Sequence, residues 1–296
     1  MDDELNSWPE TNPDTIIVDS YYITANYLRV LKDKVGQKGK LVYIDDLASF
    51  PYPVDVLVDY NAYGPTIDYR GLYNNNDVDM PRLILGLTYA PLREMFRNIP
   101  HKAQKEKAEN ILISTGGSDE LHLTLTLVHY LSNGPCKYEN KTFHFLLGAM
   151  NIDKEEIRVK AAGCENIVLH ENVSDMRRLI SSCDIVVSAA GSTMYEICSC
   201  GVPLITYSSA DNQIPGTEAF EKLGLAVNIG DVREPDSIDP SLIISGKLDE
   251  NAVDRIFMAV EELSNDFTRR REMGIKMQEM IDGFGADRMV KEILRQ

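Results

Sequence analysis

The sequence predicts an α/β protein with two parallel-sheet domains. Short apolar runs that suit buried strands alternate with helical patterns along most of the chain, and this alternation is typical of parallel sheets covered by helices. The chain has 296 residues, which is too long for one ordinary core and suits two domains of roughly 100–200 residues each. The polar stretch 98–109 contains Pro100 and three lysines without apolar periodicity, so we predict that it links the two domains.

The first predicted domain, residues 1–97, contains four strands and two helices. The strands are expected at Thr15–Val18, Lys40–Ile44, Val54–Val58 and Pro81–Leu85, and the helices at Thr24–Val35 and Ala90–Arg97. The first three strands are followed by Asp19, Asp45 and Asp59. These carboxylates therefore meet at the carboxyl edge of the sheet, which is where open parallel sheets bind ligands.

The start of the chain indicates that this first domain is truncated. Met1, Leu5 and Trp8 already have helical spacing, and a domain of only about four strands buries little surface. We therefore expect further strands to precede Met1 in the natural protein. A compact small domain that packs directly on the second domain is the alternative.

The second predicted domain, residues 110–296, continues the alternation. Strands are expected at Asn110–Ile113, Thr142–Leu147, Asn166–Leu169, Asp184–Ser188, Pro203–Thr206 and Ala226–Asn228. Helices are expected at Glu120–Leu131, Lys154–Ala162, Met176–Ser182, Thr193–Cys200 and Thr217–Leu223. The amphipathic tail, Glu250–Gln296, is predicted to be helical with a break near Gly283-Phe284-Gly285, and its last helix is expected to cross back to the first domain.

The net charge, the lack of long apolar runs and the cysteine count limit the kinds of molecule that this chain is expected to bind and the compartment in which it is expected to occur. A net charge of −16 argues against nucleic acid and anionic membranes, because both repel an acidic protein. No apolar run approaches the roughly 20 residues of a membrane span, and the acidic first residues are not a signal peptide. Five cysteines, an odd number, favour free thiols in the cytoplasm. We expect a monomer or weak dimer without metal or cofactor, and interpret Asp77-Val78-Asp79 as a solvated turn rather than a cation site.

A first glycine loop, Gly116-Gly117-Ser118, follows an apolar strand and precedes a helix. Glycines let the backbone approach a phosphate closely, and a helix N-terminus adds unpaired amides and a favourable dipole. The loop therefore suits a phosphate group. The alternative is that Ser118 or Asp119 caps the helix and the glycines only turn the chain.

A second loop repeats this arrangement at Gly191-Ser192-Thr193, after a strand that ends at Ser188. We expect the amides and hydroxyls of Ser192 and Thr193 to face an anionic oxygen. Glu196 lies one turn inside the helix, where its carboxylate can accept hydrogen bonds from a ribose diol. A capping box between Ser192 or Thr193 and Glu196 is the alternative. Two such loops at one sheet edge favour diphosphate binding.

Several segments resemble known families. Gly191–Glu196, followed by Gly201-Val202-Pro203, resembles the donor-site segment of glycosyltransferase-B enzymes, which implies a glycosyltransferase-B-like fold of two Rossmann-like domains. Five further segments are Val18–Tyr21, Tyr43–Leu47, Asp59–Asn61, Asp211–Gln213 and, most specifically, Leu85–Phe96. They resemble the UDP-2,4-diacetamido-2,4,6-trideoxy-β-L-altropyranose hydrolases of pseudaminic acid synthesis and their spore-coat-polysaccharide relatives. This resemblance covers nearly the whole chain.

The resemblance implies that UDP binds in the second domain. Residues expected at the diphosphate are Gly116, Gly117, Ser118, Gly191, Ser192 and Thr193. Glu196 would bind the ribose, and the backbone at Asn172 and Val173 would pair with uracil. Asn212 and Gln213 would lie near the sugar or phosphate. Tyr89 and Arg93 would line the cleft from the linker side.

The sequence departs from this family at the catalytic base. The family carries a Gly-x-Gly-His loop near its N-terminus, whereas this sequence has five histidines, none before His101 and none in that context. The resemblance implies a UDP-sugar hydrolase of nonulosonic acid or surface polysaccharide biosynthesis, which releases UDP and a free amino-deoxy sugar. Without the histidine we expect slow or no turnover, with Asp19 or Asp45 as the remaining candidates for a base. A glycosyltransferase with a UDP-sugar donor and a non-catalytic nucleotide-sugar binding protein are the two alternatives.

Overall fold

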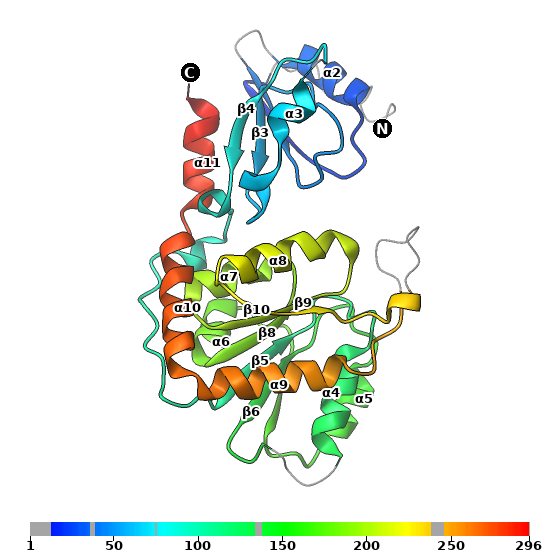
Figure 1. Cartoon of the computed structure of the whole chain (residues 1–296), viewed down its shortest axis with the longest axis vertical. Helices are drawn as coiled ribbons and strands as arrows, with labels where there is room; N and C mark the ends of the chain where they lie inside the picture. Colours follow the sequence, from blue (N-terminus) through cyan, green and yellow to red (C-terminus); the bar gives the residue numbers. More distant parts are fainter. Residues whose placement is uncertain (1–12, 36–38, 75, 134–137, 238–245, 296) are drawn as a thin grey trace. The chain divides into compact units, whose positions relative to one another are not determined.

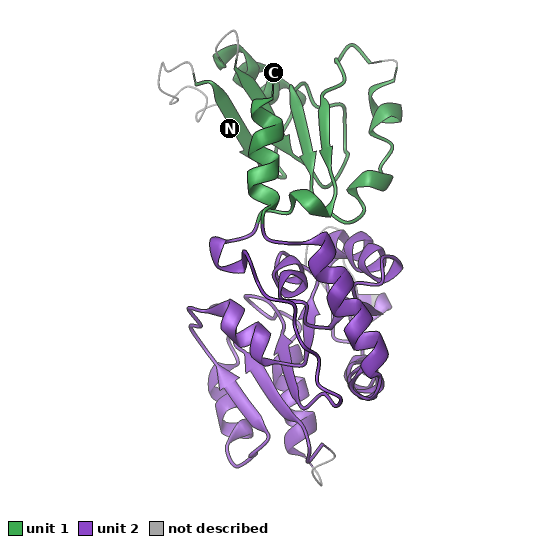
Figure 2. Ribbon diagram, turned by 90° about the vertical axis from the view of Figure 1, so that its left-hand side faces the viewer, with its two compact units in different colours: residues 1–91, 284–296 green, residues 92–283 purple. Residues whose placement is uncertain are grey.

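The computed structural model describes residues 13–35, 39–74, 76–133, 138–237 and 246–295. The chain divides into two compact units, coloured separately in Figure 2: unit 1 comprises residues 1–91 and 284–296, and unit 2 comprises residues 92–283. Each unit contains one parallel sheet, so the predicted α/β fold with two parallel sheets is confirmed. The helical spacing of Met1, Leu5 and Trp8 lies outside the described residues.

Unit 1 contains a four-stranded sheet in the order β1-β2-β3-β4. The strands are β1 (Thr15–Asp19), β2 (Lys40–Ile44), β3 (Val56–Asp59) and β4 (Arg82–Leu85), and the helices are α2 (Ala25–Lys34), α3 (Tyr69–Tyr73) and α11 (Gly285–Leu294). Successive residues of a strand face opposite sides of the sheet. Leu41 accordingly packs with Leu28 of α2 and Tyr69 of α3, whereas Val42 packs with Met289 of α11. The core of unit 1 therefore lies on both faces of its sheet.

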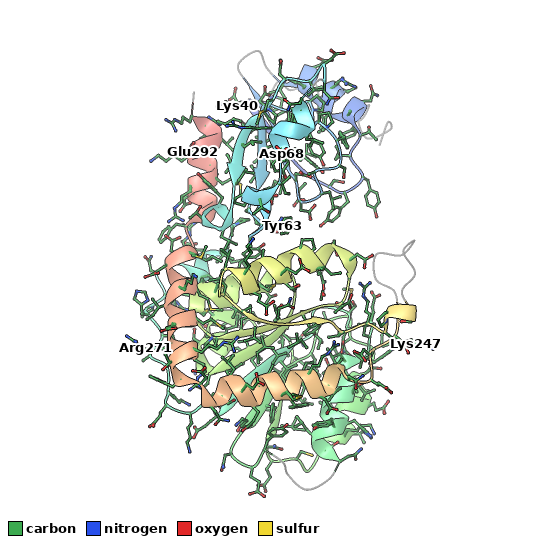
Figure 3. All side chains as sticks on the ribbon, in the orientation of Figure 1. Lys40, Tyr63, Asp68, Lys247, Arg271 and Glu292 are labelled. Atoms are coloured by element: carbon green, nitrogen blue, oxygen red, sulfur yellow. The ribbon has the colours of Figure 1, made fainter. Side chains whose placement is uncertain are left out.

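The helix α11 comes from the end of the chain but is part of unit 1 (Figure 1). Its last carbonyl groups, which have no partner within the helix, accept hydrogen bonds from two cations of the sheet. Lys40 Nζ donates to the carbonyls of Ile293 and Arg295 at 2.6 Å, and Arg82 donates to those of Glu292 and Arg295. Figure 3 labels Lys40 and Glu292 beside this helix end. Positive groups at a helix C-terminus are also favoured by the helix dipole.

Unit 2 contains a six-stranded sheet in the order β10-β9-β8-β5-β6-β7. The strands are β5 (Asn110–Ser114), β6 (Thr142–Leu146), β7 (Ile167–His170), β8 (Ile185–Ala189), β9 (Leu204–Ser208) and β10 (Val227–Asp231). The helices are α4 (Leu123–Ser132), α5 (Lys154–Ala161), α6 (Met176–Ser182), α7 (Thr193–Cys200), α8 (Ile214–Lys222), α9 (Ala252–Asn265) and α10 (Phe267–Met280). The chain builds outward from β5 to β7, then returns to build outward from β8 to β10. Ligands bind at such a reversal of strand order, beyond the carboxyl ends of the two central strands.

The predicted helix Ala90–Arg97 is wrong. Only the single turn η3 (Glu94–Phe96) forms, and the backbone of Arg93 before it is extended. Pro91 disfavours helical backbone in the residue before it, and Ala90 is indeed non-helical. Phe96 is fully buried, and its carbonyl lies so close to Gly283 that a Cβ there would be 2.3 Å away. Tertiary packing therefore keeps this segment in an irregular, largely non-helical conformation.

The stretch 98–109, which the sequence predicts as a linker, lies inside unit 2, and the units divide at 91/92 and 283/284. Its polar groups are held by distant parts of that unit. The fully buried Arg270 donates to the carbonyls of Lys105 and Glu106 at 2.9 Å. The Asp184 carboxylate accepts the amide of Glu109 at 3.0 Å. The backbone of this polar stretch is therefore held by hydrogen bonds to Arg270 of α10 and to Asp184 beside β8, as part of unit 2.

Candidate functional site

A cavity of about 300 Å³ lies at the carboxyl ends of β5, β8 and β9 in unit 2. Segments 114–121 and 188–193 line it, together with Leu123, Tyr207, Ser209 and Gln213. Ser114, the last residue of β5, pairs with Ser188, one residue before the end of β8, so the loops that follow the two strands start side by side. The two glycine loops predicted from the sequence thus meet at one cavity, at the reversal of strand order.

The N-terminus of α7 lies at this cavity, which Gly191, Ser192 and Thr193 line. Ser192 occupies the cap position, and among the described residues no side chain forms a capping hydrogen bond there. The capping box considered for Glu196 does not form. The amides of Met194 and Tyr195 donate to the carbonyls of Gly191 and Ser192. The amides of Ser192 and Thr193 and the helix dipole, equivalent to roughly half a positive charge, are therefore what α7 offers the cavity.

Glu196 instead pairs with Arg93. The Nε and Nη2 atoms of Arg93 donate to Oε1 of Glu196 at 3.0 and 2.8 Å, which leaves Oε2 as an acceptor. The Glu196 side chain is 15% exposed and that of Arg93 is 52% exposed. Burial raises the pKa of the Glu196 carboxyl, and the bond and charge of Arg93 act in the opposite direction. Arg93 also stacks over the ring of Phe96 at 5.3 Å.

The loop after β5 differs from the loop after β8. α4 begins at Leu123, later than predicted, because the Asp119 carboxylate accepts the amides of Leu123 at 3.1 Å and Thr124 at 2.9 Å. The alternative that Asp119 caps this helix is therefore the observed arrangement. The amides of α4 are occupied, so this loop offers the cavity the backbone of Gly116 and Gly117 rather than a helix end.

Gly148 holds that glycine loop in place, a role that the sequence analysis missed. The segment after β6 crosses the loop so closely that a Cβ at position 148 would lie 2.2 Å from the carbonyl oxygen of Gly117. The amide of Met150 donates to the same oxygen at 3.1 Å. A glycine directly after the predicted strand Thr142–Leu147 was the available sequence signal.

The other predicted ligand contacts belong to several different segments of the two units. Gln213 lines the cavity and accepts the amide of Ser209 through Oε1 at 2.8 Å. Asn212 is not among the lining residues. Asn172 follows β7 with a left-handed backbone of φ 50° and is exposed, beyond the cavity. Tyr89 belongs to η2 (Leu87–Tyr89) of unit 1. Their roles toward uracil and sugar stay predictions.

The carboxylates of unit 1 line a second cavity, of about 270 Å³, at the carboxyl edge of its own sheet. Asp19 is exposed there, whereas Asp45 is buried and accepts four hydrogen bonds. Two of these come from the hydroxyls of Tyr52 and Tyr69, both at 2.8 Å, and two from backbone amides. Asp45 is thus occupied as a structural acceptor, which leaves Asp19 as the more accessible of the two predicted candidates for a base.

Two other carboxylates of unit 1, Asp46 and Asp59, have raised pKa values, which the sequence alone did not indicate. Burial raises the pKa of Asp46, whose Oδ2 accepts the hydroxyl of Tyr21 at 2.6 Å. Burial also raises the pKa of Asp59 to about 6, against hydrogen bonds from Asn61 and Tyr69 that lower it. Asp46 lines the cavity of unit 1, but Asp59 is completely buried beside it. In the described part of the chain, no three His, Cys, Asp or Glu side chains gather as metal ligands would.

We predict that Gly148→Ala displaces the Gly116-Gly117 loop. The added Cβ would overlap the carbonyls of both glycines, so the free energy of unfolding should fall by roughly 1–3 kcal/mol and the amides of 115–119 should exchange faster with deuterium. Gly216→Ala in α8 is the matched control, since a Cβ there meets no atom within 4 Å and alanine favours helix. Equal stability and equal loop exchange in the two variants would contradict the role of Gly148.

A second prediction concerns Asp59. Its pKa of about 6 in the folded unit exceeds the ordinary value of 3.8, so the folded state holds the proton more tightly than the unfolded chain. Stability should therefore fall as pH rises from about 4 to about 6, by an amount on the order of 2–3 kcal/mol. Asp59→Asn should remove this fall, whereas Asp33→Asn, an exposed position on α2, should keep it. Urea unfolding at several pH values measures the slope, and identical slopes in all three proteins would refute the assignment.

The chain is similar in sequence to curated proteins and in fold to solved structures. No family profile matches the chain. It is 26% identical over 126 residues to the spore coat polysaccharide biosynthesis protein SpsG of Bacillus subtilis, covering 43% of this chain and 37% of that protein. It is also 26% identical over 195 residues to the UDP-2,4-diacetamido-2,4,6-trideoxy-β-L-altropyranose hydrolase of Campylobacter jejuni, covering 65% of each protein. The matches thus span less than two thirds of either relative.

Among solved structures, the UDP-GlcNAc 2-epimerase of Neisseria meningitidis bound to UDP-GlcNAc is similar, with a TM-score of 0.62 and 14% identity. The match covers 100% of this chain and 80% of the epimerase. Glycosyltransferases of known structure are similar as well. No helix among the described residues is long and apolar enough to cross a membrane. The predicted resemblance is confirmed: the chain is similar to the spore-coat-polysaccharide proteins and the UDP-sugar hydrolase, and its fold is glycosyltransferase-B-like.

Proposed function

We propose that this chain binds a UDP-sugar through the cavity of unit 2 and belongs to the biosynthesis of a surface polysaccharide or nonulosonic acid. The observation that carries the proposal is the meeting of two glycine loops and an uncapped helix N-terminus at the reversal of strand order. That position is where open α/β sheets bind nucleotides. The names of the relatives, a UDP-sugar hydrolase and a spore coat polysaccharide protein, support the class of ligand.

The diphosphate would be held without positively charged side chains. The lining residues include no Lys, Arg or His, and two of them, Asp119 and Glu120, are acidic. Attraction must therefore come from the α7 amides and dipole, with the backbone of Gly116 and Gly117. This arrangement also explains how a protein of net charge −16 accepts an anion: the favourable potential is local and does not require a basic surface.

The ribose would be bound by Glu196. Its Oε2, which accepts no hydrogen bond from Arg93, lies one turn along α7 from the amides proposed for the diphosphate. Arg93 fixes the carboxylate through Oε1. A fixed carboxylate loses little side-chain freedom on binding, so more of its hydrogen-bond energy contributes to affinity.

We further propose that the reaction class is hydrolysis, with water attacking the UDP-sugar and UDP leaving. Such an attack needs a base, and histidine is the side chain best suited near neutral pH. No histidine precedes His101, and the carboxylates of unit 1 with raised pKa values are half-buried, as Asp46 is, or enclosed, as Asp59 is. With Asp19 as the accessible carboxylate among the candidates for a base, nucleotide-sugar binding with slow turnover is the second candidate.

We predict that UDP binds more tightly than ADP or GDP, and that Glu196→Ala weakens UDP binding by roughly 1–3 kcal/mol, the usual effect of removing a charged hydrogen-bond partner. Titration calorimetry measures both. The variant should lose much less affinity for 2′,3′-dideoxy-UDP, which lacks the diol. Glu218→Ala, an exposed glutamate on α8, is the matched control and should bind like the unaltered chain. Absence of UDP binding, or full affinity in the Glu196 variant, would rule out this site.

We also expect slow hydrolysis. Release of UDP from the diacetamido-trideoxy sugar nucleotide should proceed roughly 10²–10⁴-fold more slowly than with a hydrolase that carries the Gly-x-Gly-His loop, because that is the usual contribution of a general base. A coupled UDP-release assay compares the two proteins under the same conditions. Comparable rates would show that an effective base lies within this chain. Release that depends on an added acceptor sugar would instead indicate a transferase.

A further inference from the structure

The hydroxyl of Tyr207 is a buried polar group without a protein partner at the wall of the unit 2 cavity. Tyr207 lies near the end of β9, lines the cavity and is 2% exposed. Within the described part of the chain, no group forms a hydrogen bond with its hydroxyl. An unpaired hydroxyl inside a protein lowers stability, so natural structures seldom keep one without a reason.

Neighbouring polar groups of the cavity already have partners. The hydroxyls of Thr115 and Thr124 share a hydrogen bond of 2.7 Å, and Oε1 of Gln213 accepts the amide of Ser209. The Asp119 carboxylate is occupied by the α4 amides and by Nδ2 of Asn151 at 3.2 Å. The hydroxyl of Tyr207 therefore keeps hydrogen-bonding capacity for a ligand, as the start of α7 does.

The chemistry of the phenol defines what it can bind. Burial, and then the nearby negative charge of Asp119, hold the pKa of the Tyr207 hydroxyl well above its ordinary value, so the proton stays on the oxygen. The group consequently acts as a donor and needs an acceptor oxygen. The backbone of the glycine loops and the first amides of α7 are also donors, and a phosphoryl group, rich in acceptor oxygens, matches a set of converging donors.

We propose that the Tyr207 hydroxyl donates a hydrogen bond to a phosphoryl oxygen of the bound nucleotide, which makes Tyr207 a residue that determines specificity for the diphosphate. This inference rests on the proposed function and adds a donor from β9 to the two glycine loops. In a position shielded from water, a hydrogen bond to a charged oxygen is strong.

The enclosed position of the hydroxyl has a structural consequence. Because Tyr207 is almost completely covered, a ligand oxygen reaches its hydroxyl only when part of the cavity wall moves. Gly116 has a left-handed backbone with φ 94°, and a Cβ added there would meet no atom within 4 Å. This part of the wall has open space beside it, so we expect bound nucleotide to alter hydrogen exchange in 115–118.

The test is Tyr207→Phe, which removes only the unpaired oxygen. Without ligand, the melting temperature of the variant should equal or exceed that of the unaltered protein, because no protein hydrogen bond is lost. With ligand, the dissociation constant for UDP should rise roughly ten- to hundredfold, as expected for a hydrogen bond to a charged group. The dissociation constant for uridine, which lacks phosphate, should not change. A purely structural tyrosine would not combine unchanged stability with a selective loss for UDP.

Tyr73→Phe is the control. The hydroxyl of Tyr73 accepts the amide of Tyr52 at 2.9 Å and donates to its carbonyl at 3.0 Å, within unit 1. This variant should lower the melting temperature and leave UDP affinity intact, the reverse of the Tyr207 result. Inorganic pyrophosphate, titrated in parallel, shows whether the phosphoryl contact needs the nucleoside.

The experiment distinguishes failure of the proposed function from failure of the role proposed for Tyr207. If the unaltered chain binds no UDP, the proposed function is wrong. If it binds UDP and Tyr207→Phe binds equally well, only the role of Tyr207 is wrong. A variant that loses uridine as strongly as UDP would also overturn the phosphoryl contact, because the loss would then lie in the nucleoside pocket.

Discussion

The parallel pairing of β5 with β8 is the constraint on which the candidate site depends. These strands are separated by two further β–α units in the sequence, yet Ser114 and Ser188 lie opposite each other at their carboxyl ends. The chain must cross over to form this pair, and no other strand can lie between the two loops that follow. A cavity forms there because the helices after β5 and β8 contact different partners, α5 in one case and α10 in the other.

Two loops with the same local pattern take different roles in this arrangement. After β5, Asp119 turns back and occupies the first amides of α4, supported by the buried Asn151. After β8, the acidic residue of α7 is drawn away by Arg93, and the helix start stays open. The difference lies in the partners that the fold brings to each carboxylate. A helix end that binds an anion must lack an internal cap, since a carboxylate there would occupy the same amides and repel the ligand.

Local patterns account for most of what the sequence predicts correctly. Strand positions such as Lys40–Ile44 follow from short apolar runs, and both glycine loops follow from their place between strand and helix. The failures arise where distant residues decide the outcome. Phe96 is buried against Gly283, which prevents a regular helix at 90–97, and Arg270 holds a polar stretch that resembles a linker. The roles of Gly148 and Tyr207 likewise depend on approaches across the sheet that no local spacing reveals.

The two units differ in the electrostatic character of their sheet edges, although both edges follow parallel strands. In unit 1 the edge gathers Asp19, Asp45 and Asp46, and burial disfavours the charged form of Asp46. Such an edge repels phosphate and suits hydroxyl or ammonium groups, which donate hydrogen bonds to carboxylates. In unit 2 the edge gathers amides and hydroxyls, and the Asp119 carboxylate there is already occupied by hydrogen bonds from the α4 amides. A nucleotide-sugar has one anionic part and one polyhydroxylated part, so the edge of unit 2 is the one that suits its diphosphate.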